Sequence, residues 1–143
     1  MPLSFDFPRV AQFVSTLTEC TIPPSGGAAI GLLRDDELVA GVLYEDFTGE
    51  GGSITGTIAV VPGAVMGKEF TRAIFAYPFK QLGVGKIIAL VSNINWKSVR
   101  LVNHMGFIET AVVQGYYPDA DLIVFEMSAT DCRWLGDEHE VHR

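Results

Sequence analysis

Hydrophobic and polar residues alternate along this chain with a period that changes from segment to segment, and each period predicts one kind of element. The first apolar residues, Val10, Phe13, Val14 and Leu17, recur at helical spacing and form one stripe. Asp6 stands where a side chain can cap the first turn of such a helix. The chain is therefore expected to open with an amphipathic helix, which ends before a segment rich in Pro, Ser and Gly.

Three apolar segments follow, in which side chains alternate between apolar and polar or stay apolar throughout, as in half-buried and buried strands. The expected strands lie at residues 28–34, 38–47 and 54–60, with turns at Asp35-Asp36 and at residues 48–52. Because both connections are short, neighbouring strands are expected to run antiparallel.

The pattern then changes to that of a strand–helix–strand unit. A glycine-containing loop at residues 62–67 opens onto a helix that is expected from about Lys68. Pro78 should end or kink this helix, because proline removes a helix hydrogen bond and its ring clashes with the preceding turn. A short apolar strand at residues 86–91 follows, and its connection through a helix predicts parallel pairing with the third strand.

A further helix is expected to begin after a capping residue, which is either Asn93 or Asn95, and to end at Gly106 in a left-handed conformation. Its apolar face is expected to comprise Trp96, Val99, Val102 and Met105. A closing hairpin is expected from strands at residues 107–114 and 122–128, around a turn at residues 115–119.

These elements predict one α/β (α+β) domain over residues 1–130, with a mixed, mostly antiparallel sheet flanked by helices. Residues 131–143 form a mostly polar tail. A length of 143 residues and 48% hydrophobic residues fit a single packed domain. No apolar run is long enough to span a membrane, and the start lacks the features of a signal peptide, so the sequence predicts a cytoplasmic protein.

The charge is unevenly distributed along the chain. The net charge is −7, which argues against nucleic-acid binding. Residues 68–100 nevertheless contain six basic residues and one acidic residue, a local net charge of +5. Such a zone suits a small polyanion better than a nucleic-acid duplex, although the charge pattern taken alone is better explained by ordinary solvated helix faces. The cysteines Cys20 and Cys132 and the three histidines match no metal-ligand spacing, so no metal site is expected.

One motif has a specific family likeness. Asn95 is followed by Ser98 three residues on, Leu101 six on, and Gly106-Phe107 eleven and twelve on. Together with the order of the surrounding elements, this pattern resembles the GNAT-type N-acetyltransferases. The likeness covers residues 28–128; the family's first strand and second early helix have no counterpart among the predicted elements. It implies a GNAT-like acyl-CoA N-acyltransferase fold whose sheet splits beside the cofactor loop.

The resemblance implies acetyl-CoA as cosubstrate and a set of residues to bind it. The positions that it indicates are Val60, Val61, Gly63, Ala64, Val65, Met66, Gly67, Lys68, Arg72, Asn95 and Ser98. Backbone N–H groups of the loop would meet the pyrophosphate at a helix N-terminus, where the helix dipole favours an anion. The loop departs from the family pattern, because Gly63 and Gly67 are four residues apart and no Gln or Arg leads them.

Two catalytic residues common in the family are missing. Val102 replaces a Tyr that protonates the leaving thiolate, and the strand before the cofactor loop has no Glu to act as base. Glu45 and Asp46 are the candidate bases, against a reading as exposed strand-end acids. Tyr116 and Tyr117 are the candidate acids, against a reading as packed rings. Ser98 is a further candidate near the reacting sulfur.

The resemblance implies N-acetylation of a primary amine on a small molecule or a peptide, without nucleic acid or membrane as partner. A homodimer and a monomer are both left open. The missing side chains support an alternative, a degenerate GNAT-like domain that binds CoA or a protein without catalysis. A looser likeness, in Tyr77-Pro78-Phe79 and in Cys132-Arg133-Trp134-Leu135, points to small GNAT-like proteins of bacteriophages and prophages.

Overall fold

Seven strands form one mixed sheet, in the order β1-β2-β3-β4-β5-β7-β6, in the part of the chain that the structure describes. The structure is a computed structural model, and it describes residues 2–18 and 27–135. The strands are β1 (Leu3–Ser4), β2 (Ala28–Arg34), β3 (Glu37–Glu45), β4 (Ser53–Val60), β5 (Lys86–Ser92), β6 (Ile108–Tyr117) and β7 (Ala120–Ser128). All neighbours are antiparallel except β4 and β5, which are parallel as the strand–helix–strand pattern predicts. The expected α/β class is confirmed.

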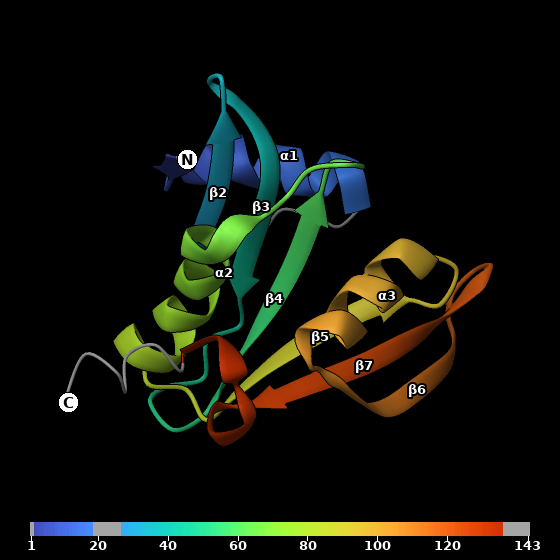
Figure 1. The fold of residues 1–143 in the computed structure, drawn as a ribbon. Helices are drawn as coiled ribbons and strands as arrows, with labels where there is room; N and C mark the ends of the chain where they lie inside the picture. Colours follow the sequence, from blue (N-terminus) through green and yellow to red (C-terminus); the bar gives the residue numbers. More distant parts are fainter. Residues whose placement is uncertain (1, 19–26, 136–143) are drawn as a thin grey trace.

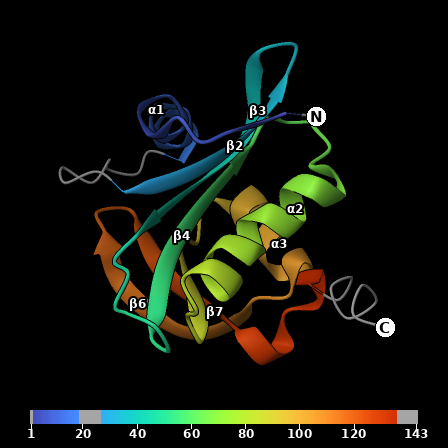
Figure 2. The same ribbon diagram turned by 90° about the vertical axis from the view of Figure 1, so that its left-hand side faces the viewer.

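Three α-helices cover the sheet unequally. They are α1 (Phe7–Thr18), α2 (Gly67–Ala76) and α3 (Trp96–Met105). The helix α1 lies on one face, over β2, β3 and β4, whereas α2 and α3 lie on the other face (Figures 1 and 2). Val10, Ala11 and Val14 pack against Leu43 and Ala59 under α1. A larger apolar core, centred on Phe70 and Phe125, lies between the sheet and the other two helices.

Pro78 marks the change in α2 that the sequence predicts. After Ala76 the chain continues as one π-helical turn, Tyr77–Gln81, closed by a hydrogen bond from the Leu82 N–H to the Tyr77 carbonyl. A wider turn at this point accommodates a residue that cannot donate a backbone hydrogen bond.

Several boundaries differ from the expected ones. A two-residue strand, β1, precedes α1; it is too short to leave a periodic pattern. The closing hairpin is longer than expected, because Tyr117 pairs with Ala120 and the turn contains only Pro118 and Asp119. Tyr116 and Tyr117 therefore lie in β6 and not in a loop. In α1, Leu17 is exposed, and Ala11 takes its place in the buried stripe.

The C-terminal segment packs on the core beyond residue 130, the predicted end of the domain. Trp134 donates from Nε1 to the Met105 carbonyl at 2.8 Å and stacks on Phe75, with ring centroids 6.2 Å apart. Leu135 is buried. Burial raises the pKa of the Cys132 thiol, while Cys20 and residues 136–143 lie outside the described part of the chain. Among the described residues no cluster of His, Cys, Asp or Glu could hold a metal ion, and no helix is long and apolar enough to cross a membrane.

Candidate active site

The candidate site lies where the two parallel strands stop pairing. The ladder between β4 and β5 contains three pairs, Ser53 with Lys86, Ile54 with Ile87 and Thr55 with Ile88. Beyond Thr55 the two strands diverge, so that the sheet is split between its two halves (Figure 1). One edge of β4 consequently continues for five residues without a strand partner.

The direction of the backbone groups along β4 follows from one hydrogen bond. The Val61 N–H donates to the Val39 carbonyl of the preceding strand segment, at 2.8 Å. Because this direction alternates along an antiparallel strand, Val60, Ile58 and Gly56 point their N–H and C=O groups toward the split. Val60 and Val61, the two strand residues predicted to face the cofactor, therefore direct their backbone N–H groups to opposite sides of β4. Val60 faces the split, whereas the N–H of Val61 is held by the other side of the sheet.

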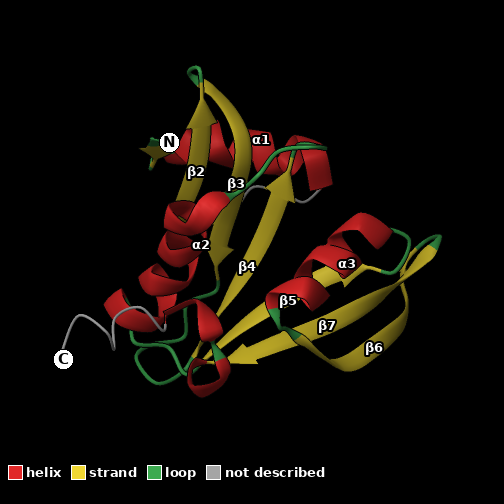
Figure 3. Cartoon of the chain, in the orientation of Figure 1, coloured by secondary structure: helices red, strands yellow, loops and turns green. Residues whose placement is uncertain are grey.

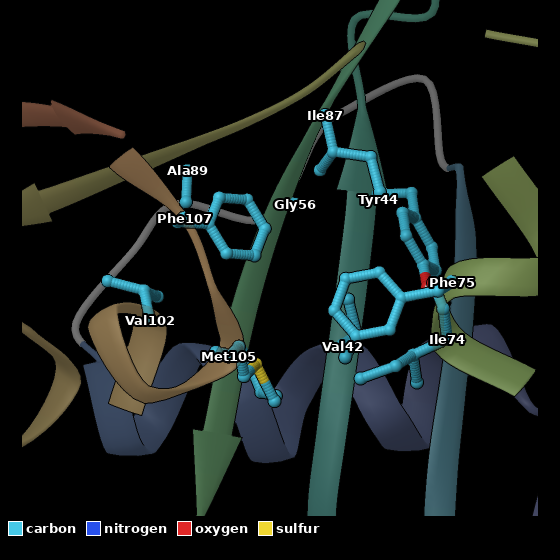
Figure 4. Close-up of a pocket in the computed structure, with 11 residues that line it drawn as sticks. Val42, Tyr44, Gly56, Ile74, Phe75, Ile87, Ala89, Val102, Met105 and Phe107 are labelled. Atoms are coloured by element: carbon cyan, nitrogen blue, oxygen red, sulfur yellow. The ribbon is translucent and has the colours of Figure 1, made fainter. Parts of the chain in front are cut away.

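An apolar pocket lies at the split, between α2, α3 and the sheet (Figure 4). Its lining comprises Val42, Tyr44, Gly56, Ile58, Ile74, Phe75, Ile87, Ala89, Val102, Met105 and Phe107. Phe75 and Phe107 stand on opposite sides of it, with ring centroids 6.3 Å apart. The space between the side chains is about 30 Å³, enough for only one or two water molecules.

Tyr44 is the one titratable side chain among these lining residues. Its hydroxyl donates to the Ile74 carbonyl of α2, and its ring contacts that of Tyr77 with centroids 5.1 Å apart. Burial, with a smaller contribution from Tyr77, raises the pKa of the Tyr44 phenol well above its ordinary value. The phenol therefore remains protonated and joins β3 to α2.

The glycine loop that precedes α2 has the geometry of an anion site. Gly63 and Gly67 have φ values of 84° and 75°, in the left-handed region that favours glycine. Met66 is the N-cap of α2, and among the described residues it makes no side-chain capping hydrogen bond. The first N–H groups of the helix are directed outward at the positive end of the helix dipole. Lys68 is exposed in this first turn, and Arg72 lies one turn further on.

A hollow of about 420 Å³ lies beside this loop, on the side of the β2–β3 turn. Its walls are formed by Val61, Pro62, Gly63 and Ala64 together with Arg34, Asp35, Glu37 and Val39. Arg34 thus stands beside the loop as a further basic residue. Sequence reasoning missed it, because only the folded hairpin brings residue 34 next to residue 63.

Asn95 is the N-cap of α3, which decides between the two predicted capping residues. Its Oδ1 accepts a hydrogen bond from the Ser98 N–H at 3.3 Å. Asn93 instead bonds to Asp121 in the closing hairpin, through its N–H at 2.9 Å and its Oδ1 at 3.1 Å. Trp96, expected on the buried face, is exposed, with the cationic groups of Lys97 and Arg100 within 6 Å of its ring centre.

Glu45 lies at the closed end of the split, on the face opposite the pocket. It is the last residue of β3 and pairs with Thr55, the last β4 residue that pairs with β5. Burial, followed by the neighbouring Asp46, raises the pKa of the Glu45 carboxyl. A carboxylate whose pKa is raised toward neutrality is a better proton acceptor than an ordinary surface glutamate.

Glu126 has the opposite environment on the same face. The pairs Glu45–Thr55, Thr55–Ile88 and Ile88–Glu126 place it in one row with Glu45 across four strands. Lys86 Nζ lies 2.7 Å from Glu126 Oε1, and Thr110 donates to Oε2 at 3.0 Å. The hydrogen bond from Lys86, then that from Thr110, lowers the pKa of Glu126. Its carboxylate is therefore ionised and already paired.

The two candidate acids lie far from this row. Tyr117 is nine residues beyond Ile108, which pairs with Glu126 in the row of Glu45 and Thr55. At the rise of an extended strand, this separation is about 25–30 Å. Tyr116 and Tyr117 pack edge to face, with centroids 4.9 Å apart, at the tip of the hairpin. The structure thus brings Glu45 close to the split and leaves both tyrosines at its open end.

Solved structures superpose on this fold over most of its length. Spermidine N-acetyltransferase SpeG from Vibrio cholerae, in complex with CoA and spermine, superposes with a TM-score of 0.70 at 15% identity, covering 91% of this chain and 96% of that chain. The fold is that of the GNAT acyl-CoA N-acyltransferases.

Two further structures with the GNAT fold agree. A point mutant of the same Vibrio cholerae enzyme gives a TM-score of 0.73 at 14% identity, covering 96% of this chain and 99% of that chain. An acetyltransferase of the GNAT family from Bacillus anthracis gives 0.63 at 17% identity, covering 90% and 95%. No family model matches the sequence, and no curated protein matches it. The likeness to these solved structures is thus one of fold.

Proposed function

We propose that the protein is a cytoplasmic N-acetyltransferase that moves an acetyl group from acetyl-CoA to a primary amine. The observation that supports this most is the half-length ladder between β4 and β5. It leaves backbone N–H and C=O groups of Gly56, Ile58 and Val60 open toward an apolar pocket. An amide-rich chain such as the pantetheine arm of CoA can pair with such an edge as an added strand would.

Three groups of described residues are proposed to hold acetyl-CoA from its pyrophosphate to its acetyl group. Gly63 to Gly67 and Lys68 would bind the pyrophosphate at the N-terminus of α2, helped by Arg72. Asn95 and Ser98 would lie near the sulfur, at the start of α3. A pocket of about 30 Å³ favours an acetyl group over longer acyl chains. When bound, acetyl-CoA supplies the activated acyl thioester.

The proposed mechanism assigns the proton to Glu45. Its carboxylate accepts a proton from the incoming ammonium group, which makes the amine nucleophilic. The N–H of Gly56 or of Ile58 donates to the thioester carbonyl oxygen as that oxygen gains negative charge. Val102 lines the pocket and has no proton to give. After the attack the nitrogen would lose its second proton to water. A thiol with a pKa near 8.5 would leave as thiolate, so the mechanism needs neither Tyr116 nor Tyr117.

The acceptor is proposed to be a small cationic amine. The supports are a net charge of −12 outside the basic zone of residues 68–100, where four basic residues face sixteen acidic ones, and the carboxylates of Glu45 and Asp46 at the closed end of the split. The Vibrio cholerae neighbour is crystallised with spermine. Peptide amines are a second class to be tested. The likeness to phage-encoded proteins rests on the sequence alone and stays a prediction.

The test is release of free CoA from acetyl-CoA in the presence of spermidine, spermine, a simple monoamine and a short peptide. We expect turnover with at least one amine, and a loss of roughly 100-fold or more in Glu45→Gln. Glu50→Gln, an exposed carboxylate in the loop after β3, is the matched control and should retain activity. Binding of acetyl-CoA in calorimetry without turnover of any amine would favour the degenerate, non-catalytic alternative. Absence of both binding and turnover would refute the proposal.

A further inference from the structure

The two edges of the sheet are protected very differently. One edge is β1, which has two residues and therefore offers almost no backbone for another strand to pair with. The other edge is β6, which has ten residues and lies along the outside of the molecule (Figure 3). Its only charged residue is Glu109. A long, nearly uncharged edge strand is a surface that other strands bind readily.

The strand β6 is also exposed on both of its faces. Nine of its ten residues are exposed, Tyr117 being the exception. Val112 pairs with Ile123 and Val113 with Leu122, so these two valines point to opposite faces of the sheet. They are 48% and 44% exposed, and Ile108 is 61% exposed. An edge strand with one face on its own core would instead alternate between buried and exposed residues.

More apolar surface lies on the same half of the sheet. Leu90 on β5, Ile94 just before α3 and Trp96 at its start are exposed. With the four large apolar residues of β6, they are seven of the eleven large exposed hydrophobic residues among those described. Tyr116 of β6 alone, more than half exposed, offers on the order of 100 Å². A stable interface buries about 800 Å² per partner, and the four exposed apolar residues of β6 would supply part of its apolar area.

We infer that β6 is the interface of a homodimer, in which it pairs antiparallel with β6 of a second copy. A strand paired with its own copy about a two-fold axis closes both open edges at once and leaves none for a third chain. The result is a sheet continuous through two molecules, whose remaining edges are the two short β1 strands.

The register of this pairing follows from irregularities in β6. The ladder to β7 shifts between Glu109 and Ala111 and again between Val113 and Tyr117. The regular stretch between the shifts, residues 111–113, is where a second strand can pair in register, so the axis lies beside Val112 or Val113. Each Glu109 then lies away from the axis, and the two carboxylates do not oppose each other.

Residues beside a two-fold axis meet their own copies, and this provides the test. Two double variants are made, Val112→Lys with Val113→Lys, and Val112→Glu with Val113→Glu. Since both valines are exposed in the single chain, each variant should fold. Sedimentation velocity over a wide concentration range should show a dimer for the parent chain. Either variant alone should dissociate at least about 100-fold more readily, because like charges meet at the axis.

Mixing the lysine and glutamate variants should restore a dimer, because opposite charges then face each other. Phe5→Lys is the matched control; Phe5 is also an exposed apolar residue, at 68%, but lies beside the β1 edge, and its variant should remain dimeric. A monomeric parent chain, a dimeric lysine variant, or a mixture that stays monomeric would each overturn the inference.

If a variant fails to fold, amide hydrogen exchange of the parent chain tests the dimer instead. The amides of residues 111–113 should exchange more slowly at high protein concentration, and equal exchange at all concentrations overturns the proposal. None of these outcomes depends on acetyl transfer.

Discussion

The two halves of the sheet on either side of the split are covered to very different degrees. On one side, β2, β3 and β4 lie between α1 and α2, and buried side chains occur on both faces. On the other side, α3 contacts β5, and nine of the ten residues of β6 are exposed. The comparison indicates that the first half supplies most of the stability. The second half leaves side chains and a strand edge exposed, and the proposed site and the proposed dimer interface both involve this half.

The largest expected effect concerns the first half. Phe70 of α2 is fully buried between the sheet and the helix, so Phe70→Ala should cost about 3–5 kcal/mol of unfolding free energy. Phe47, half exposed after β3, is the control, and Phe47→Ala should change stability by less than about 0.5 kcal/mol. Urea denaturation measures both. Equal effects at the two positions would break the comparison.

This half is also the one that sequence reasoning predicts best. Regular alternation from Ile54 to Val60 and the turn at Asp35-Asp36 specify neighbouring strands with one register. The second half is harder, because Val112, Val113 and Tyr116 look like buried residues in the sequence. Their exposure depends on which elements fold over β6, and no local pattern encodes that.

The second prediction concerns the two carboxylates of the row across the split. Glu45→Gln should remove the base, whereas Glu126→Gln should change turnover by less than about tenfold, since Glu126 is ionised and paired with Lys86. Steady-state kinetics with acetyl-CoA and a reactive amine compare the two. A larger loss of turnover in Glu126→Gln than in Glu45→Gln would contradict the prediction, because the base would then lie on β7, on the other side of the split.

The raised pKa of Glu45 gives this prediction a direction in pH. The carboxylate accepts a proton only above its pKa, so kcat/KM should rise with pH through a value above 4.5, the ordinary pKa of Glu. In Glu45→Gln the pH profile of kcat/KM should lose this rise and keep only the rise at higher pH that comes from deprotonation of the amine substrate.

The same raised pKa affects stability. A carboxyl group whose pKa is raised in the folded state contributes stability below its unfolded pKa, and that contribution is lost as pH rises through the folded pKa. Glu45→Gln should thus be slightly more stable than the parent at neutral pH.

The candidate site was predictable only in part. The motif at Asn95 and Ser98 and the loop at Gly63 have signatures in sequence, because capping and left-handed turns need particular residue types. The position of Glu45 beside Thr55 depends on the register of two strands that are separated by a loop. The distance of Tyr117 from that row depends in turn on how far the hairpin extends.

The third prediction separates two duties of Asn95 in the second half. As the N-cap of α3 it accepts a hydrogen bond from Ser98, so Asn95→Ala should cost about 1 kcal/mol of stability. Serine caps helices about as well, and Asn95→Ser should retain that stability. If both variants weaken acetyl-CoA binding in calorimetry, Asn95 contacts the cofactor directly. If only the alanine variant does, the side chain acts through the helix end.

The smallest expected effect concerns the pair of Lys86 and Glu126, which joins β5 to β7. Both side chains are partly exposed, so Lys86→Met should cost less than about 1 kcal/mol at neutral pH, and less still in high salt. The pKa of Glu126 is lowered, so the stabilisation is present above the unfolded pKa near 4.5 and is lost as pH falls through the lower folded pKa. Parent and variant should therefore converge in stability well below pH 4.5.

A double-mutant cycle with Glu126→Gln, measured by urea denaturation, separates the contribution of the Lys86–Glu126 pair from that of the hydrogen bond that Thr110 of β6 donates to the same carboxylate. A coupling of several kcal/mol, or one that persists in acid, would mean that this half of the sheet is held more rigidly than its exposure indicates.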